Sequence, residues 1–510
     1  MQIYSDKCFT NPIKIIEANG DLEAAIREID GLRKEYFLIG YITYDFKYLY
    51  FEVYDKYEKY SPSKAKQLGT IIKPMITKEE YVQAVNKIKE YIREGVTYEV
   101  NYTYPSEVLT NLDGVELYEA LLDRQKTPYN AYIENSHTTL LSFSPELFFK
   151  LEGRRILTKP MKGTMPCLGD GKDEERRDFL YHDTKNRAEN IMIVDLLRND
   201  LGRIAKAGSV KVEKLFEIEK HPTVFQMTSE VSAEIEDEIG LYEIFKAIFP
   251  CGSITGAPKV STMRVIEELE PFSRNIYCGA IGFLSPEGAE FSVPIRILYG
   301  KNHKYTYHSG GAIVWDSTAE DEWEETVTKT KFIQTDFQLI ETGVDEWESH
   351  LARLENSAFK LGFKFHKPLI EGAKRFLLNK DGSFIVEEKS FPPIKSNKIR
   401  ICRRVNSANP FLYHKTTIRE QVQTDVFDEI AVNERGEITE GTFTNIAVQM
   451  KGKLFTPPVS CGLLAGTYRK KLIEQGRMKE KILYPEDLEK AEKIFCFNSV
   501  RKLVEVELCL

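Results

Sequence analysis

The sequence predicts a chain of mixed α+β or α/β class with two domains, and three observations support this. At 510 residues the chain is longer than one ordinary domain. Alternating apolar runs typical of strands are interleaved with segments whose apolar residues recur at helical spacing. After residues 338–345 the pattern begins again with a new amphipathic segment, ESHLARLENSAFKLGF. We therefore expect a larger domain over residues 1–340 and a smaller one over residues 341–510.

The composition limits the possible function classes. Apolar residues make up 42% and charged residues 29% of the chain, and the net charge is −8, which favours a globular protein and argues against nucleic-acid binding. No apolar run reaches the length of a membrane span, and MQIYSDKCFTNPIK at the start lacks a signal-peptide core. The eight cysteines include no CxxC pair. We therefore expect a cytoplasmic protein with reduced thiols and with no membrane or nucleic-acid partner.

Local patterns predict the main elements of the first domain. YFLIGYITYDF (36–46) predicts a strand, and KEEYVQAVNKIKEYIRE predicts a helix over about 78–94. A long helix is predicted over 185–204, KNRAENIMIVDLLRNDLGRI. Its apolar residues are expected to share one buried face; they are Ile191, Val194, Leu197 and Leu201.

A last helix of the first domain is predicted from Ser317 to about residue 339. Ser317 and Glu320 form the S-x-x-E pattern of a capping box. Glu322 and Glu325 lie three apart and share a face of this helix. They could be part of a solvated acidic surface, or they could hold a divalent cation together with Glu189 of the long helix. Mg²⁺ prefers one or two carboxylates, waters and an anionic substrate group, but spacing alone leaves both interpretations open.

Two runs of small residues predict close approach of the backbone to a ligand. FPCGSITGAPK (249–259) places glycines and hydroxyls before a helix start, where free N–H groups and the helix dipole favour an anion. SGGAI (309–313) is a second such run. Each could also be an ordinary tight turn. Neither matches a nucleotide-binding phosphate loop, so together they favour a ligand with carboxylates.

The order of motifs over residues 36–335 resembles that of the chorismate-binding enzymes, which include the large subunit of anthranilate synthase and component I of aminodeoxychorismate synthase. The motifs are SPELFF, PMKGT, NRAENIMIVDLLRNDLGRI, PCGSITGAPK, YCGAIGF, IRILY and the WEET helix. The resemblance implies a large domain of packed antiparallel sheets with outer helices, chorismate as substrate and Mg²⁺ at the site.

Carried over residue by residue, the resemblance also implies roles within that site. The metal carboxylates are Glu189, Glu322 and Glu325. The substrate-binding residues are Tyr277 and Arg296 for the enolpyruvyl carboxylate, the backbone of Gly310 and Gly311, and Ser253 and Lys259. An arginine with N–H donors on one carboxylate and a cation on the other is what a dicarboxylate requires.

Lys162 lies in KPMKGTMP, where spacing alone would make it a solvated turn lysine. The matching turn is similar to P-I-A-G-T in anthranilate synthases and to P-I-K-G-T in aminodeoxychorismate synthases. The resemblance therefore implies that Lys162 attacks C2 of chorismate and that ammonia then adds at C4. Because an attacking amine must be neutral, we expect the site to lower the pKa of Lys162 by burial or by a neighbouring cation such as Lys259.

Three positions depart from the usual pattern of these relatives. Glu99 stands where YQVN is common, Gln226 where several relatives carry histidine, and Asn186 where many carry aspartate. A carboxylate at Glu99 keeps open an isochorismate-type reaction in which water is added. No G-x-C-x-G turn typical of a glutaminase is present, so we expect a separate glutamine amidotransferase subunit to supply ammonia.

The second domain contains a lysine and a glutamate on neighbouring elements. DEIAVNERGEITEGTFTNIAV (428–448) predicts a hairpin around Glu-Arg-Gly. Lys415 and Glu440 could each be ordinary surface residues. A lysine for a Schiff base and an acid for the pyridinium nitrogen are, however, the pair that pyridoxal phosphate needs.

Several motifs resemble the class IV aminotransferase fold of D-amino acid aminotransferase, which includes 4-amino-4-deoxychorismate lyase. They are ESHLARL, YHKTT, NERGEITEGTFTNI, PPVSCGLLAGTYR and FCFNSVRKLVEV. The resemblance implies that Lys415 forms the Schiff base, Glu440 pairs with the pyridinium and Arg353 anchors the phosphate. The Gly466-Thr467 turn would cradle the phosphate by its backbone N–H groups. The segment LIETGVDEWESHLARL is shorter than in relatives, so lyase activity could be weak or lost.

Together the resemblances predict a bifunctional enzyme of folate-precursor synthesis. The first domain would make 4-amino-4-deoxychorismate, and the second would release pyruvate from it and leave 4-aminobenzoate. One alternative is an anthranilate synthase-like or isochorismate synthase-like enzyme with an inactive second domain. The other is a binding or regulatory protein that retains these residues without catalysis.

Overall fold

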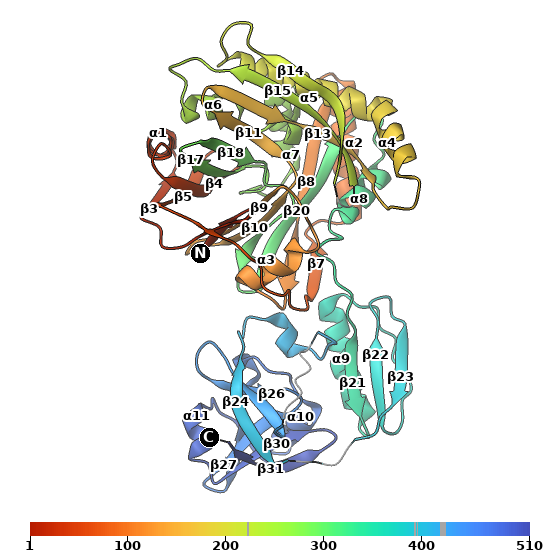
Figure 1. The fold of residues 1–510 in the computed structure, drawn as a ribbon. Helices are drawn as coiled ribbons and strands as arrows, with labels where there is room; N and C mark the ends of the chain where they lie inside the picture. The colour runs from red at the N-terminus through yellow and green to blue at the C-terminus, as the bar shows by residue number, and fades with distance from the viewer. Residues whose placement is uncertain (222–223, 392–393, 395, 419–424, 510) are drawn as a thin grey trace.

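The computed structural model describes residues 1–221, 224–391, 394, 396–418 and 425–509. Figure 1 shows a larger body built by the N-terminal part of the chain and a smaller body built by the C-terminal part. The first strand of the smaller body is β21 (Leu339–Gly343), which pairs with β22 (Lys374–Leu378). A division between residues 340 and 341 stays a prediction, and β21 crosses it.

Two antiparallel sheets form the larger body in the described ranges. One has the order β16 (Gly256–Ala257), β8 (Glu99–Thr110), β20 (Lys304–Ile313), β19 (Ile297–Lys301), β10 (Thr139–Ser144), β9 (Tyr129–Glu134), β1 (Gln2–Tyr4), β2 (Lys7–Phe9) and β6 (Glu58–Lys59), with β7 (Thr70–Pro74) beside β8. The other has the order β13 (Met161–Pro166), β15 (Val224–Glu234), β12 (Arg155–Lys159), β11 (Leu147–Glu152), β18 (Gly288–Ser292), β17 (Ala280–Ser285), β4 (Phe37–Ile42), β5 (Tyr48–Tyr54) and β3 (Lys14–Asn19), with β14 (Lys211–Lys220) beside β15.

The main core of the larger body lies between these two sheets. Residues of β1, β9 and β10 from one sheet pack with residues of β4, β5, β11 and β17 from the other. The predicted strand over 36–46 is confirmed as β4, whose Leu38 and Ile39 are both fully buried. A strand covered on both faces has no polar alternation, which is why this segment is continuously apolar.

Helices cover the outer faces of the sheets, as the resemblance implied (Figure 1). The helices α2 (Lys78–Arg93), α7 (Lys259–Leu269) and α8 (Ala319–Thr328) pack on β8 and β20 through a shared apolar cluster. The helices α4 (Asp173–His182) and α5 (Thr184–Gly202) pack on the β13–β15 end of the other sheet. The remaining helices of this body are α1 (Glu23–Leu32), α3 (Gly114–Leu122), α6 (Leu241–Ile248) and the short η1 (Gly252–Ile254).

The structure corrects the start and the end of the predicted last helix. Thr318, not Ser317, is the N-cap of α8, and its hydroxyl accepts from the N–H of Asp321 at 3.2 Å. Ser317 instead donates to Glu322 Oε1 at 2.6 Å. The helix ends at Thr328 rather than near residue 339. The chain then turns across the sheet, where the Tyr307 hydroxyl of β20 donates to the carbonyl of Lys329.

The buried face of α5 also differs from the prediction at one position. Ile191 is 50% exposed, whereas Ile193 is fully buried. The buried face includes a polar residue, Asn190, whose side-chain oxygen accepts from Ser229 Oγ of β15 at 2.6 Å. Val194, Leu197 and Leu201 are buried as predicted, but an apolar pattern cannot identify a face that is partly polar.

Two sheets form the smaller body in the part of the chain that is described. The first is β21–β22–β23 (Phe384–Glu388), with α9 (Trp347–Leu361) against it. The second is a mixed sheet in the order β26 (Ile438–Gly441), β25 (Asp428–Val432), β24 (Lys398–Arg404), β31 (Lys502–Leu508), β30 (Lys493–Asn498), β27 (Asn445–Met450), β28 (Lys453–Thr456) and β29 (Met478–Glu480). The other helices are η2 (Pro410–Tyr413), η3 (Val459–Cys461), α10 (Thr467–Glu474) and α11 (Pro485–Glu489). The predicted hairpin around Glu-Arg-Gly is confirmed as β25 and β26.

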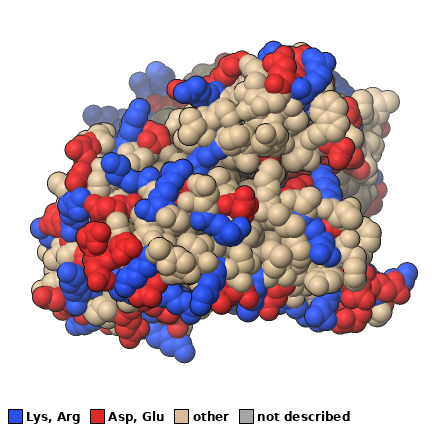
Figure 2. Space-filling model, turned by 90° about the horizontal axis from the view of Figure 1, so that it is seen from above, with Lys and Arg blue, Asp and Glu red and all other residues tan. Residues whose placement is uncertain are grey.

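The surface carries both signs of charge. Figure 2 shows the molecule from above, with Lys and Arg side chains interspersed among Asp and Glu side chains and apolar or neutral residues between them. Among the described residues, no helix has the length and apolar character needed to cross a membrane.

Candidate active sites

Lys162 lies on the short strand β13, where it pairs with Met227 of β15. The pairing is irregular at the next residue, Gly163, which adopts a φ of +73°. A Cβ at Gly163 would lie 2.7 Å from the side chain of Asn186 on α5. Glycine is therefore required here both by the backbone conformation and by the close approach of the helix. This contact brings the part of β13 that carries Lys162 close to the start of α5.

The Lys162 ammonium is buried among carboxylates. Its Nζ donates to Glu99 Oε1 at 2.6 Å and lies 4.0 Å from Glu189 Oε2. Burial alone would lower the pKa of Lys162, but Glu99, Glu189 and Glu146 together raise the pKa above its usual value. The expectation of a lowered pKa is therefore wrong, because the neighbouring charges are acids.

Lys259 is not the neighbouring cation that the sequence suggested. Its Nζ donates to Asp200 Oδ2 at 2.5 Å and to the carbonyl of Ile248 at 3.0 Å. Lys259 therefore ties the start of α7 to α5 and α6. Pro258 is the N-cap of α7.

Glu146 is a candidate residue that the sequence analysis missed. It follows β10 in the SPELFF motif, it is 4% exposed, and it accepts a hydrogen bond from Ser253 Oγ at 2.5 Å. Burial raises the pKa of Glu146 to about 7, while Ser253 and Lys162 act in the opposite direction. A carboxyl group with a pKa near neutrality can hold or release a proton under working conditions. Its motif was the available signal, but the acid stands alone there and no spacing rule marks it.

The three predicted metal carboxylates come from α5 and α8. Burial raises the pKa of both Glu189 and Glu322. The negative charge of another acid of the group, Glu322 for Glu189 and Glu325 for Glu322, raises each pKa further. A Cβ at Gly311 would lie 3.1 Å from Glu322 Oε2 and 3.6 Å from Glu325 Oε1, so a side chain there would crowd both carboxylates. Lys329 donates to Glu325 Oε1 at 2.7 Å and to the carbonyl of Gly310 at 2.7 Å. Oxygen ligands of this kind fit a hard cation such as Mg²⁺.

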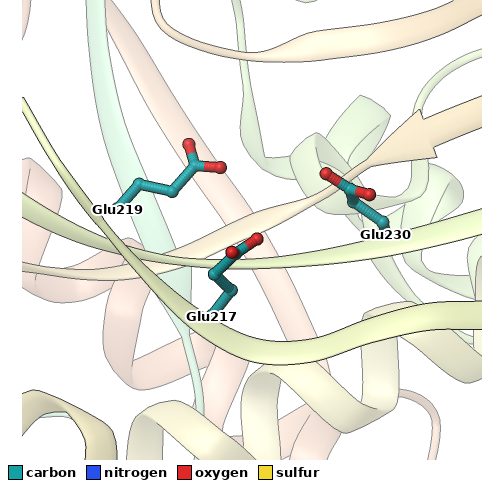
Figure 3. Close-up of side chains that lie close together, drawn as sticks. All are labelled: Glu217, Glu219 and Glu230. Atoms are coloured by element: carbon teal, nitrogen blue, oxygen red, sulfur yellow. The ribbon is translucent and has the colours of Figure 1, made fainter.

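In the described residues, a group of three carboxylates within 4.8 Å of one another lies elsewhere, on β14 and β15. Figure 3 shows Glu217, Glu219 and Glu230 turned toward a common space. Lys159 contacts Glu219 and lies 3.7 Å from Glu230, and Lys214 lies 2.9 Å from Glu217 and 3.4 Å from Glu230. These lysines compensate the acids, so the cluster is an ion-pair network of the sheet.

Tyr277 and Arg296 lie beside the β20 strand that carries the glycine pair. Arg296 has a φ of +55°, and burial lowers the pKa of its guanidinium. Among the described residues, Arg296 has no carboxylate within 4.0 Å. A partly buried guanidinium without an acidic neighbour can bind an anionic group of a substrate. The ring of Tyr277 stacks on His308 at 4.9 Å, and burial lowers the pKa of that imidazole to about 3.

The three departures from the usual pattern lie around Lys162. Glu99 accepts the hydrogen bond from the lysine, and its second oxygen, Oε2, is buried with no hydrogen-bond partner in the described residues. Gln226 lies on β15 opposite Thr164. The backbone N–H of Asn186 donates to Asp183, the N-cap of α5, at 3.0 Å.

A second candidate site lies in the smaller body, around Arg353 of α9. The guanidinium donates twice to Glu341 of β21, at 2.8 and 2.6 Å, and once to the carbonyl of Ala465 at 3.1 Å. Ala465 immediately precedes Gly466, the N-cap of α10, so the guanidinium adjoins the N–H groups at the start of that helix. An arginine and a helix start together fit a phosphate. Arg353 is thus held by two partners, Glu341 and Ala465, that sequence reasoning did not identify.

The other predicted residues of this site lie close to Arg353. The charge of Glu440 raises the pKa of Arg353, and the charge of Lys415 lowers that of Glu341. Asn445 donates to Glu440 Oε2 at 3.1 Å, and a Cβ at Gly466 would lie 2.1 Å from Asn445 Oδ1. The structure therefore brings the predicted cofactor residues together; they are Lys415, Glu440, Arg353 and Thr467.

Glu341 and His350 were not identified from the sequence. Burial would raise the pKa of Glu341, but Arg353, His350 and Lys415 lower it to about 2. His350 Nδ1 lies 2.8 Å from Glu341 Oε2, and its Nε2 lies 3.4 Å from Thr467 Oγ1. These residues connect β21, α9 and α10. The acid in LIET and the histidine in ESHLARL were visible, but only the fold makes them neighbours.

Two family models match the chain. A model described as chorismate binding enzyme matches residues 50–335, which is more than half of the chain. A model described as amino-transferase class IV matches residues 378–509. The first match contains all residues of the Lys162 site. The second contains Lys415, Glu440 and Thr467, and it begins after Arg353.

Curated relatives match the first of these regions. Aminodeoxychorismate synthase component 1 of Escherichia coli K12 is 38% identical over 278 residues, covering 54% of this chain and 61% of the relative. The component 1 of Bacillus subtilis is 36% identical over 280 residues, covering 54% and 59%. Anthranilate synthase component 1 of Aquifex aeolicus is 37% identical over 275 residues, covering 53% and 55%. The chain thus spans less than two thirds of the length of these curated relatives, and identity alone does not separate the two activities that their names state.

Solved structures share the fold of the larger body. Anthranilate synthase component I from Streptococcus pneumoniae TIGR4 has a TM-score of 0.58 at 22% identity, covering 65% of this chain and 92% of that chain. The menaquinone-specific isochorismate synthase from Escherichia coli has a TM-score of 0.55 at 17% identity, covering 64% and 85%. At these identities the likeness shows the fold alone.

Proposed function

Because this chain belongs to the chorismate binding enzyme family and continues into an amino-transferase class IV unit, we propose that it is a bifunctional enzyme that converts chorismate to 4-aminobenzoate. The first unit aminates chorismate to 4-amino-4-deoxychorismate. The second unit removes pyruvate from that product. The observation that carries the proposal is Lys162, a buried amine that donates to Glu99 and lies 4.0 Å from Glu189, in a motif that resembles the lysine-containing turn of aminodeoxychorismate synthases.

In the first reaction, the Lys162 amine attacks C2 of chorismate as the hydroxyl leaves C4. Glu99 accepts the hydrogen bond of the ammonium and is placed to take its proton. Glu146, whose pKa burial raises to about 7, would give a proton to the departing hydroxyl, which leaves as water. Ammonia then adds at C4 and the lysine leaves C2, so the enzyme is regenerated.

The remaining residues of this site bind and orient the substrate. Arg296 and Tyr277 hold the enolpyruvyl carboxylate, with the backbone of Gly310 beside it. Glu189, Glu322 and Glu325 would hold Mg²⁺, and their donor set fits such a hard cation. When bound, Mg²⁺ neutralises the negative charge of the ring carboxylate.

In the second unit, the residues present fit pyridoxal phosphate. Arg353 and the start of α10 would hold the phosphate, Glu440 would pair with the pyridinium nitrogen, and Lys415 would hold the cofactor and move the proton. The cofactor supplies an electron sink for the elimination of pyruvate. Glu341 keeps Arg353 in place through two hydrogen bonds.

A partner and a cellular location complete the proposal. The relatives are named component 1, and we expect a glutamine amidotransferase subunit to supply ammonia to the first unit. The eight cysteines are all free, which is consistent with the proposed cytoplasmic location. The 4-aminobenzoate formed would serve folate synthesis.

Product analysis tests this function. Purified protein is incubated with chorismate, ammonium and Mg²⁺, with and without pyridoxal phosphate, and the aromatic products are separated. Equal amounts of 4-aminobenzoate and pyruvate support both units. A reaction that stops at 4-amino-4-deoxychorismate until an outside lyase is added would remove the second half of the proposal. Anthranilate or isochorismate as the product would contradict the role of Lys162, and the variant Lys162→Ala serves as the control for background chemistry.

A further inference from the structure

The segment that carries Lys415 packs against the first unit. Residues 409–418 run from η2 to the end of the described part of this loop. Phe411 and Ile418 of this segment belong to an apolar cluster that also contains Ile71 of β7 and borders Leu109 of β8. The two ends of the Lys415 segment are therefore buried against strands of the other body.

The packing at this contact is close. A Cβ at Gly69 would lie 2.9 Å from Ile418 Cγ1 and 3.0 Å from Phe411 Cε1. Gly69 is itself held in place, because its N–H donates to Asn111 Oδ1 at 2.7 Å. The carbonyl of the same Asn111 accepts from the side chain of Asn409 at 3.2 Å. The first unit thus contacts the segment through both apolar and polar groups.

Within the smaller body, hydrogen bonds hold the backbone on both sides of Lys415. The Lys415 carbonyl accepts from the N–H of Ile340 at 2.8 Å, and the N–H of Thr417 donates to the carbonyl of Gln338 at 3.0 Å. His414 Nδ1 lies 2.9 Å from Ser357 Oγ of α9. The backbone of Lys415 is therefore bonded to β21, while Phe411 and Ile418 of the same segment pack against Gly69 and Ile71 of the first unit.

We propose that Gly69 and Ile71 of the first unit are positioning residues for Lys415 of the second unit. This inference rests on the proposed role of Lys415 in holding pyridoxal phosphate. The surface that β7 presents acts as part of the second active site, although it belongs to the chorismate-binding domain. Loosening it displaces the lysine backbone and weakens the cofactor site without touching the residues around Lys162.

Matched variants of the full chain test this role. Gly69→Ala places a methyl group against Ile418 and Phe411, whereas Gly31→Ala, on a helix of the same domain, meets nothing within 4 Å. Ile71→Ala is compared with Ile16→Ala, which removes an equally buried isoleucine from the core between the sheets. Ile71→Val is the conservative replacement that should restore the wild-type behaviour.

Two readouts are measured for each variant. The first is the dissociation constant of pyridoxal phosphate, from the absorbance of the bound cofactor. The second is the hydrogen-exchange rate of backbone amides in residues 411–418, which does not require the cofactor. We expect Gly69→Ala and Ile71→Ala each to weaken cofactor binding and to speed this exchange by about tenfold or more, because overpacking or a cavity destabilises a closely packed contact. Formation of 4-amino-4-deoxychorismate should stay within about twofold of wild type.

The outcomes separate the inference from the proposed function. Unchanged exchange and unchanged cofactor affinity in Gly69→Ala and Ile71→Ala would overturn the inference, as would equal losses in the Ile16→Ala control. If wild-type protein binds no pyridoxal phosphate, the proposed function of the second unit fails. In that case faster exchange in Gly69→Ala still supports positioning of the segment by β7, and unchanged exchange refutes it.

Discussion

The pair Glu341–Arg353 in the second site allows a quantitative prediction. Glu341 is 1% exposed, and Arg353, His350 and Lys415 overcome its burial and lower its pKa from 4.5 to about 2. At about 1.4 kcal/mol per pKa unit, the drop from 4.5 to about 2 corresponds to roughly 3–4 kcal/mol of folding free energy. Replacing the acid in Glu341→Gln removes this contribution and leaves the Arg353 guanidinium without its carboxylate.

The sign of the pH effect follows from the lowered pKa. A carboxyl group whose pKa is lower in the folded state contributes stability above its unfolded pKa and loses it as the pH falls through the folded pKa. The wild-type second unit should therefore lose roughly 3–4 kcal/mol of stability between pH 5 and pH 2 from Glu341 alone. At pH 7 Glu341→Gln should be destabilised by about 3–5 kcal/mol, as for other buried pairs that lose one partner.

Urea unfolding at several pH values measures these effects. Trp347 on α9 reports on the second unit when Trp315 and Trp323 are replaced by phenylalanine. The same samples are titrated with pyridoxal phosphate, and Glu341→Gln should bind it more weakly because Arg353 loses its orientation. An acid-induced loss of stability in Glu341→Gln equal to that of wild type would refute the reasoning.

A matched control comes from α9, the helix that carries Arg353. Glu348 forms an ion pair with Lys367 at 2.5 Å, but its side chain is 81% exposed. Exposed pairs of this kind contribute about 0–1 kcal/mol. Glu348→Gln should therefore change neither the stability nor the cofactor affinity measurably, and a loss as large as that of Glu341→Gln would show that the assay reports on charge in general.

Three further predictions concern the first site. Lys162→Ala should reduce formation of 4-amino-4-deoxychorismate to background in the chromatographic assay while leaving the thermal unfolding of the protein cooperative; product at the wild-type rate would exclude the covalent role. Burial raises the pKa of Glu146 to about 7, so the amination rate should fall as the pH rises through that value. Glu146→Gln should lower the rate by about 10²–10⁴-fold and remove this pH dependence. A pH profile of Glu146→Gln identical to that of wild type would contradict a proton-donor role. Glu322→Gln should weaken Mg²⁺ binding in calorimetry by about tenfold or more, whereas Glu320→Gln, exposed on the same helix, should not; equal affinities in both would place the metal elsewhere.

Much of the site could be predicted from residue types within motifs. Lys162, Glu189, Arg353 and Lys415 stand in motifs that resemble those of the two families, so their assignment to two candidate sites followed from resemblance. The charges around these residues, and therefore their pKa values, could not be predicted from the motifs. A sequence shows that Lys162 and Glu99 exist, but the 2.6 Å contact between them depends on the pairing of β13 with β15 and on the position of β8. That contact reverses the expected direction of the lysine pKa.

The sequence by itself determined the classes of the elements, the two units and the residue types of both sites, because these depend on local periodicity and on motifs of neighbouring residues. Only the tertiary structure decided which acids surround Lys162, that Glu146 and Glu341 belong to the sites, and that β7 packs against the Lys415 segment. These features join residues that are distant along the chain, such as Gly69 and Ile418. Burial and charge act through space, so their effects on pKa and packing appear only when the fold sets the distances.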